Sequence, residues 1–284
     1  MRLNFKNKMK AICNICLWLI LFSGLGCRNK QGSLPIQNPK KTETIADLGA
    51  LPLYVTDPPE NLSNPDKINL GRFLFFDPIL SGNQDVSCAT CHQPEFNYAE
   101  FLQTSIGVNG LGRGSKRRFA IQNDIPFVKR NSQSILNTAF NGLKNGGKYD
   151  PEVAPMFWDL RYKGLEQKAL EPIKTLEEMR GNGYHQDVIV KEIVGRIRKI
   201  PAYNQFFAKA FAGESDPVNE VNLAKAIAAY ERTLIAPHTR FDQYMRGDSN
   251  ALSLSEKDGL QIFLATGCAK CHSGPMFSDF QMHV

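Results

Sequence analysis

The sequence lacks several features that would place it in common classes of protein. Its longest apolar run, residues 11–26, has sixteen residues, fewer than the roughly 20 that a membrane-spanning helix needs. No Lys/Arg-rich run with interleaved aromatic residues is present. Residues 1–26 hold four cations and no acid, so the rest of the chain is close to neutral. The composition therefore argues against nucleic acid as a partner.

The sequence also has no strand-like alternation of polar and apolar residues over more than five positions. Apolar residues recur instead at helical spacing, which predicts an all-α protein. The expected helices cover residues 66–76, 187–200, a segment opened by Pro201, residues 219–235, and a segment that Ser255 caps before the end of the chain.

The N-terminus has the pattern of an export signal. Cations precede the apolar run, which predicts a signal peptide over residues 1–26, with an uncleaved membrane anchor as the alternative. Cys27 follows at once, where a lipoprotein signal is cut, although Gly24 stands where that motif usually has Leu. A lipid anchor at Cys27 and simple secretion to the periplasm both remain open. Residues 27–65, rich in Pro, Asn, Lys and Thr, are expected to form a tether.

Histidine is scarce, yet two of the five histidines directly follow a CxxC pair. Two thiols can bond to the vinyl groups of a porphyrin while the adjacent imidazole binds the iron. A zinc site built from CxxC pairs would not explain a histidine after both. The pattern predicts two covalently attached haem c groups, at Cys88, Cys91 and His92 and at Cys268, Cys271 and His272.

The two motifs are far apart, so each is expected to have its own cytochrome c-like domain, over residues 66–205 and 206–284. Of the other histidines, His185 and His238 lie in turn sequences and are expected at the surface. None lies in the loop after the first motif, so the first haem is expected to have an open iron position. An open position favours peroxide chemistry over simple electron transfer.

The sequence resembles the bacterial di-haem cytochrome c peroxidase and MauG family over about residues 50–284. The resemblance is carried, in this order, by residues 70–81, 87–92, 129–132, 157–161, 169–173, 178–179, 241–244 and 267–280. It implies that the N-terminal haem reacts with hydrogen peroxide. It also implies that the C-terminal haem receives electrons from a small cytochrome c or a cupredoxin.

The resemblance also implies roles for single residues. Glu178 corresponds to the acid/base glutamate of the family, and Trp158 to an aromatic side chain that relays electrons between the haems. Asn131 corresponds to a residue of a calcium site. The resemblance leaves open whether the protein forms a homodimer. The alternatives are a MauG-like oxidase acting on a protein or small molecule, and a non-catalytic electron-transfer cytochrome.

The chain departs from the family pattern in four places. The distal-loop histidine, expected near Asn123, is absent, which suggests activity without reductive priming. Lys168 stands where the family has an active-site glutamine, and residues 141–155 form a Gly/Lys-rich insertion. The chain ends twelve residues after His272, so the second domain is expected to be incomplete. Met282 and His283 are poor candidates for the sixth ligand of its haem.

Overall fold

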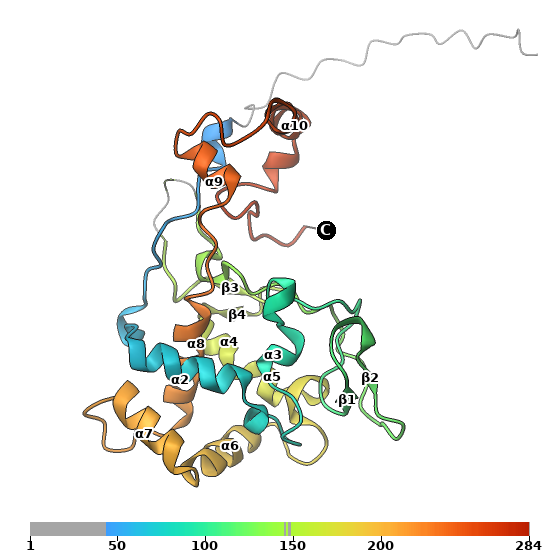
Figure 1. Cartoon of the computed structure of the whole chain (residues 1–284), viewed down its shortest axis with the longest axis vertical. Coiled ribbons are helices and arrows are strands. Elements are labelled where there is room, and N and C mark those ends of the chain that lie inside the picture. The colour runs from blue at the N-terminus through green and yellow to red at the C-terminus, as the bar shows by residue number, and fades with distance from the viewer. Residues whose placement is uncertain (1–43, 145, 147–148, 284) are drawn as a thin grey trace, which may run out of the picture. The chain divides into compact units, whose positions relative to one another are not determined.

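The computed structural model describes residues 44–144, 146 and 149–283, and it is rich in helices (Figure 1). The predicted signal peptide, Cys27 and most of the predicted tether lie outside these residues. None of the described helices combines the length and the apolar character needed to cross a bilayer.

Helix α2 (Pro65–Phe76) confirms the first predicted helix, and its start follows from local chemistry. The Asn64 side chain accepts a hydrogen bond from the Lys67 N–H (2.8 Å), and Pro65 occupies the first turn, where no N–H partner is needed. The helix packs on α8 (Glu220–Glu231). Gly71 allows this close contact, because a Cβ there would lie only 1.9 Å from the carbonyl oxygen of Ala226.

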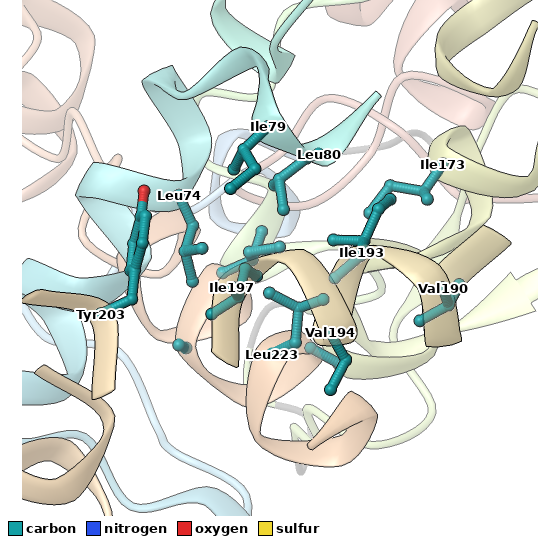
Figure 2. Close-up of a cluster of buried hydrophobic side chains, with 14 of the residues drawn as sticks. Leu74, Ile79, Leu80, Ile173, Val190, Ile193, Val194, Ile197, Tyr203 and Leu223 are labelled. Atoms are coloured by element: carbon teal, nitrogen blue, oxygen red, sulfur yellow. The ribbon is translucent and has the colours of Figure 1, made fainter. Parts of the chain in front are cut away.

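Helix α6 (Ile189–Arg198) confirms the helix predicted over residues 187–200. Ile189, Ile193 and Ile197 follow one another every four residues, and all three are fully buried in the main core. Figure 2 shows Ile193 and Ile197 in this core. Burying each such side chain contributes about 1.5–3 kcal/mol. Pro201 then opens α7 (Pro201–Ala210), as expected, so the predicted domain boundary after residue 205 falls inside a helix.

Most of the remaining elements in the described part of the chain are short. The other α-helices are α3 (Cys88–Cys91), α4 (Gly164–Ala169), α5 (Glu171–Lys174), α9 (Arg240–Met245) and α10 (Leu254–Ala265). A π-helix, η7, covers Leu176–Arg180. The 3-10 helices are η1 (Ile45–Asp47), η2 (Pro59–Asn61), η3 (Pro78–Leu80), η4 (Pro94–Phe96), η5 (Gly114–Lys116), η6 (Thr138–Phe140) and η8 (Cys268–Lys270).

Two small antiparallel ladders accompany the helices. Strand β1 (Gly110–Leu111) pairs with β2 (Arg118–Phe119), and β3 (Pro155–Met156) pairs with β4 (Tyr162–Lys163). Each strand has two residues, which agrees with the lack of alternation in the sequence.

The predicted cap of the last helix was wrong by two residues. Ser253, not Ser255, precedes α10: its hydroxyl accepts from the Glu256 N–H, and the Glu256 carboxylate accepts from the Ser253 N–H. This reciprocal capping box satisfies two backbone N–H groups at the start of the helix. Ser255 already lies inside the first turn, so it is not the residue that caps the helix.

The C-terminal helices have a small core of their own. Leu260 and Leu264 of α10 pack with Leu48 and with Ala269 of η8. The Leu51 N–H donates to the Asp242 carboxylate (2.8 Å). Part of the segment expected to be a tether, residues 44–51, therefore packs against these helices.

Candidate haem and peroxide site

The first CxxCH motif borders a cavity of about 500 Å³. The motif forms helix α3, one turn that Ser87 precedes. Further walls come from the β3–β4 turn, α4, η7 and the end of α8. The chemically reactive or charged side chains that line the cavity include Cys88, Cys91, His92, Trp158, Lys168, Glu178 and Glu231.

The ring of His92 makes the kind of hydrogen bond that a metal-binding histidine usually makes. Its Nδ1 lies 3.1 Å from the carbonyl oxygen of Tyr98 and 3.2 Å from the hydroxyl of Ser132. Because a carbonyl only accepts, Nδ1 carries the proton and Nε2 keeps its lone pair. Burial lowers the pKa of His92 to about 4, helped by the positive charge of Lys168, so the ring is neutral.

These features fit a covalently attached haem. Both thiols of the motif and the neutral imidazole border one cavity, and most of the exposed wall area is apolar. An apolar wall suits a porphyrin, and the Nδ1 hydrogen bond is the usual outer support of a metal-bound histidine.

Glu178 lies on the π-helix η7, whose backbone is held from two sides. The Val108 N–H donates to the Glu178 carbonyl (3.1 Å), and the Gly82 N–H donates to the next carbonyl (2.8 Å). A Cβ on Gly107 would lie 2.1 Å from the Glu178 carbonyl oxygen, and one on Gly82 would lie 1.8 Å from that of Arg180. Only glycine permits either approach. The two loops thus position the glutamate, at a helix type that often occurs at functional sites.

The Glu178 carboxyl lies in an environment that brings its pKa close to neutral pH. Burial, and then the charge of Glu177, raises its pKa to about 7, against the opposing effect of Arg161 and Lys168. A general acid/base works best when its pKa is close to the working pH. The sequence assigned this role by resemblance, and the structure places the side chain on the wall of the same cavity as His92.

Trp158 is not a core residue, although it also lines the cavity. Its side chain is 56% exposed, and its indole N–H donates to the Asn131 carbonyl (3.0 Å). The turn that carries it has two non-glycine residues with positive φ, Phe157 (68°) and Leu160 (56°), a conformation that such residues rarely adopt. Asn131 itself uses its amide nitrogen to reach the Leu102 carbonyl (2.5 Å). Its calcium role stays a prediction.

The buried ion pair between Lys168 and Glu231 was missed by the sequence analysis. Lys168 was noted only as a replacement for glutamine, and Glu231 was not noted at all. A signal was present, because Glu231 ends a helix whose preceding residues, such as Ala228 and Tyr230, are apolar and buried. A carboxylate buried among apolar side chains needs a cation or a hydrogen-bond donor beside it, because an unpaired buried charge is unfavourable.

The remaining histidines lie away from this cavity. His185 and His238 are exposed, as the turn sequences predicted. Asn123, at the position where the family histidine was expected, bonds to the Ile125 backbone instead (2.6 Å). Within the described residues that line the cavity, His92 is the one histidine.

The second motif has a different setting. Cys268, Cys271 and His272 are all exposed. His272 nevertheless repeats the contact of His92, since its Nδ1 lies 3.1 Å from the Phe277 carbonyl oxygen. His283 was one of the two residues considered as the sixth ligand of the second haem. Its Nε2 lies 2.9 Å from the Asp279 carboxylate and is therefore already in contact with another side chain.

Comparison with known proteins agrees with this geometry. Residues 65–250 match the family described as "Di-haem cytochrome c peroxidase". The chain is 37% identical over 205 residues to the cytochrome c551 peroxidase of Pseudomonas aeruginosa, covering 72% of this chain and 49% of the relative. It is 32% identical over 244 residues to the methylamine utilization protein MauG of Methylorubrum extorquens. This match covers 84% of this chain and 59% of the relative.

A solved structure, that of a MauG-like protein associated with microbial copper homeostasis, has the same fold with a TM-score of 0.62 and 25% identity, over 82% of this chain and 61% of that one. The chain thus spans about half to three-fifths of the length of these relatives. The family implies haem c as the cofactor. The chain belongs to the di-haem cytochrome c peroxidase family.

Proposed function

We propose that the chain is a di-haem c-type cytochrome peroxidase, which combines hydrogen peroxide with two electrons and two protons to give two water molecules. The observation that carries the proposal is the position of Glu178. Its carboxyl group, with a pKa near 7, lines the same cavity as the CxxCH motif. An electron carrier has no need of such a proton carrier beside its haem.

Six residues would hold the two cofactors. Cys88 and Cys91 would form the thioether bonds of the first haem and His92 would bind its iron through Nε2, while Cys268, Cys271 and His272 would do the same for the second. When bound, the haem supplies the redox centre for peroxide reduction.

The protein's own contribution to the chemistry is proton transfer by Glu178. Its ionised carboxylate would take the proton from one peroxide oxygen and deliver it to the other, which then leaves as water. The carbonyl contacts with the Val108 N–H and the Gly82 N–H hold the backbone of η7 in place for both steps.

Electrons would reach the first cavity through Trp158, whose ring lies at its edge. We assign the donor to the class of small cytochromes c or cupredoxins, and we place the protein in the periplasm, where the predicted signal would send it. A lipid anchor at Cys27 and a calcium ion at Asn131 belong to the same proposal.

A MauG-like oxidase is the second candidate function, and two observations favour it. Trp158 is exposed, so oxidation of an external substrate through this ring is open to the protein. Asn123 stands where the family histidine would cap the iron. Substrate assays with and without peroxide separate this oxidase from a peroxidase.

The test is Glu178→Gln in the full chain with both haems attached. Loss of the ionisable group should lower peroxide turnover by about 10²- to 10⁴-fold. Glu192→Gln, the same change at an exposed position of α6, is the matched control and should leave turnover unchanged. If Glu178→Gln kept native turnover, this acid/base assignment would be wrong.

A further inference from the structure

A buried cation lies in the wall of the first cavity. Lys168 of α4 and Glu231 at the end of α8 form an ion pair in which Nζ lies 2.8 and 2.9 Å from the two carboxylate oxygens. Their side chains are 10% and 3% exposed. Separating the two groups would leave each charge buried without a partner, so the charge of Lys168 is held in one place.

This cation differs from the others at the cavity. Lys129, Arg130 and Arg161 also line it, but all three are exposed, and water screens their charges. The charge of Lys168 acts through a medium of lower effective dielectric constant than the exposed cations do, and the adjacent Glu231 carboxylate offsets part of it.

Lys168 also keeps hydrogen-bonding capacity. An ammonium group has three N–H donors, and among the described residues Glu231 is its acceptor, with two oxygens. A third donor is left for a molecule that enters the cavity. A glutamine, the residue that the family resemblance leads one to expect at this position, would offer a neutral amide instead.

We propose that Lys168, held by Glu231, is a specificity-determining residue that makes this cavity a binding site for small monovalent anions. The same charge would stabilise the negative charge that develops on peroxide as its proton passes to the Glu178 carboxylate. This second role rests on the proposed peroxidase function, whereas anion binding does not.

The test uses the full chain with both haems attached in the ferric state and fluoride as the probe, with the dissociation constant read from the absorbance spectrum at pH 6. The double variant Lys168→Gln/Glu231→Gln removes both charges and leaves neither partner buried alone. It should bind fluoride about tenfold more weakly. Lys174→Gln, which removes a half-exposed lysine paired with Glu171, is the matched control and should bind as the native protein does.

Glu231→Gln alone gives an independent test, because it keeps the cation and removes its counter-charge. Fluoride should then bind about threefold more tightly, whereas a purely structural pair would give equal or weaker binding. Equal or weaker binding in this variant, or native affinity in the folded double variant, overturns the proposal.

Peroxide turnover, measured on the same samples, keeps the two proposals apart. Absence of turnover in the native protein with the fluoride series as expected would reject the peroxidase and leave the anion site standing. If the native protein turns over peroxide and the variants bind fluoride with unchanged affinity, the anion site is rejected and the peroxidase is supported.

Discussion

The two CxxCH motifs share their local geometry and differ in everything around it. In both, the histidine Nδ1 lies 3.1 Å from a carbonyl oxygen five or six residues later, which leaves Nε2 free for iron. His92, however, is half-buried on a cavity with Lys168 and Glu178, whereas His272 is exposed. The motif determines how a haem is held. The surrounding elements determine what chemistry it can do.

The difference has a physical origin in the number of elements that meet at each motif. The first is enclosed by distant segments, among them η7 and the end of α8, which bring charged groups into a low-dielectric space. The second sits beside the core formed by Leu48, Leu260, Leu264 and Ala269. Burial shifts the pKa of groups at the first motif, such as His92 and Glu178.

The largest expected effect compares the two iron ligands directly. His92→Ala should abolish peroxide turnover and leave the spectrum of the second haem intact. His272→Ala should alter that second spectrum and leave binding of fluoride at the first haem unchanged. Absorbance spectra of the two variants, with and without fluoride, check this. Equal losses in both would show that the sites do not differ as described.

A smaller effect, still large, is expected from pH. The pKa of Glu178 is raised to about 7, and the base is active only when ionised, so the ionised fraction falls as pH drops below 7. The value of kcat/KM should therefore rise about 100-fold between pH 5 and pH 8, with an apparent pKa near 7. In Glu178→Gln this step should vanish. A native profile that is flat over this range would contradict the assignment.

Gly107→Ala tests the backbone support of Glu178. The new Cβ would lie 2.1 Å from the Glu178 carbonyl oxygen, so the loop or η7 must move. We expect a loss of about 1–3 kcal/mol in the free energy of unfolding, with reduced peroxide turnover. The control is Gly195→Ala in α6, where a Cβ meets no atom within 4 Å, and helix propensity should stabilise it by about 0.5–1 kcal/mol. Thermal unfolding and peroxide turnover are measured for both variants. Native stability and turnover in Gly107→Ala would contradict the proposed support of Glu178.

The smallest effect is expected at the start of α10, the helix that precedes the second motif. Ser253→Ala removes the hydroxyl that caps α10 and should cost about 1 kcal/mol. Because α10 packs in the C-terminal core, fluoride binding at the first cavity should stay native while thermal unfolding shifts. A change in fluoride affinity would show that the two regions are coupled.

Several features of the fold could be predicted because they depend on neighbours in sequence. Helices α2, α6 and α7 were expected from apolar spacing and from prolines, and the structure has them within a few residues. The capping error at α10 arose because two serines lie two positions apart, and only backbone geometry shows which one precedes the first turn.

Other features could not be predicted from local sequence. The π-helix η7 has no apolar period of its own, and its form depends on the loops at Gly82 and Gly107. Tryptophan is usually buried, and only the turn between β3 and β4 places Trp158 at the surface.

The sequence by itself determined the cofactor chemistry, because CxxCH brings two thiols and an imidazole together within five residues, whatever the rest of the chain does. The tertiary structure decided which of the two motifs has a reactive environment. Lys168 and Glu231 are 63 positions apart, and Glu178 lies far from His92 in the sequence. Only the packing of α4, η7 and α8 around α3 places these charges on one cavity, where they can alter the proton affinity of their neighbours.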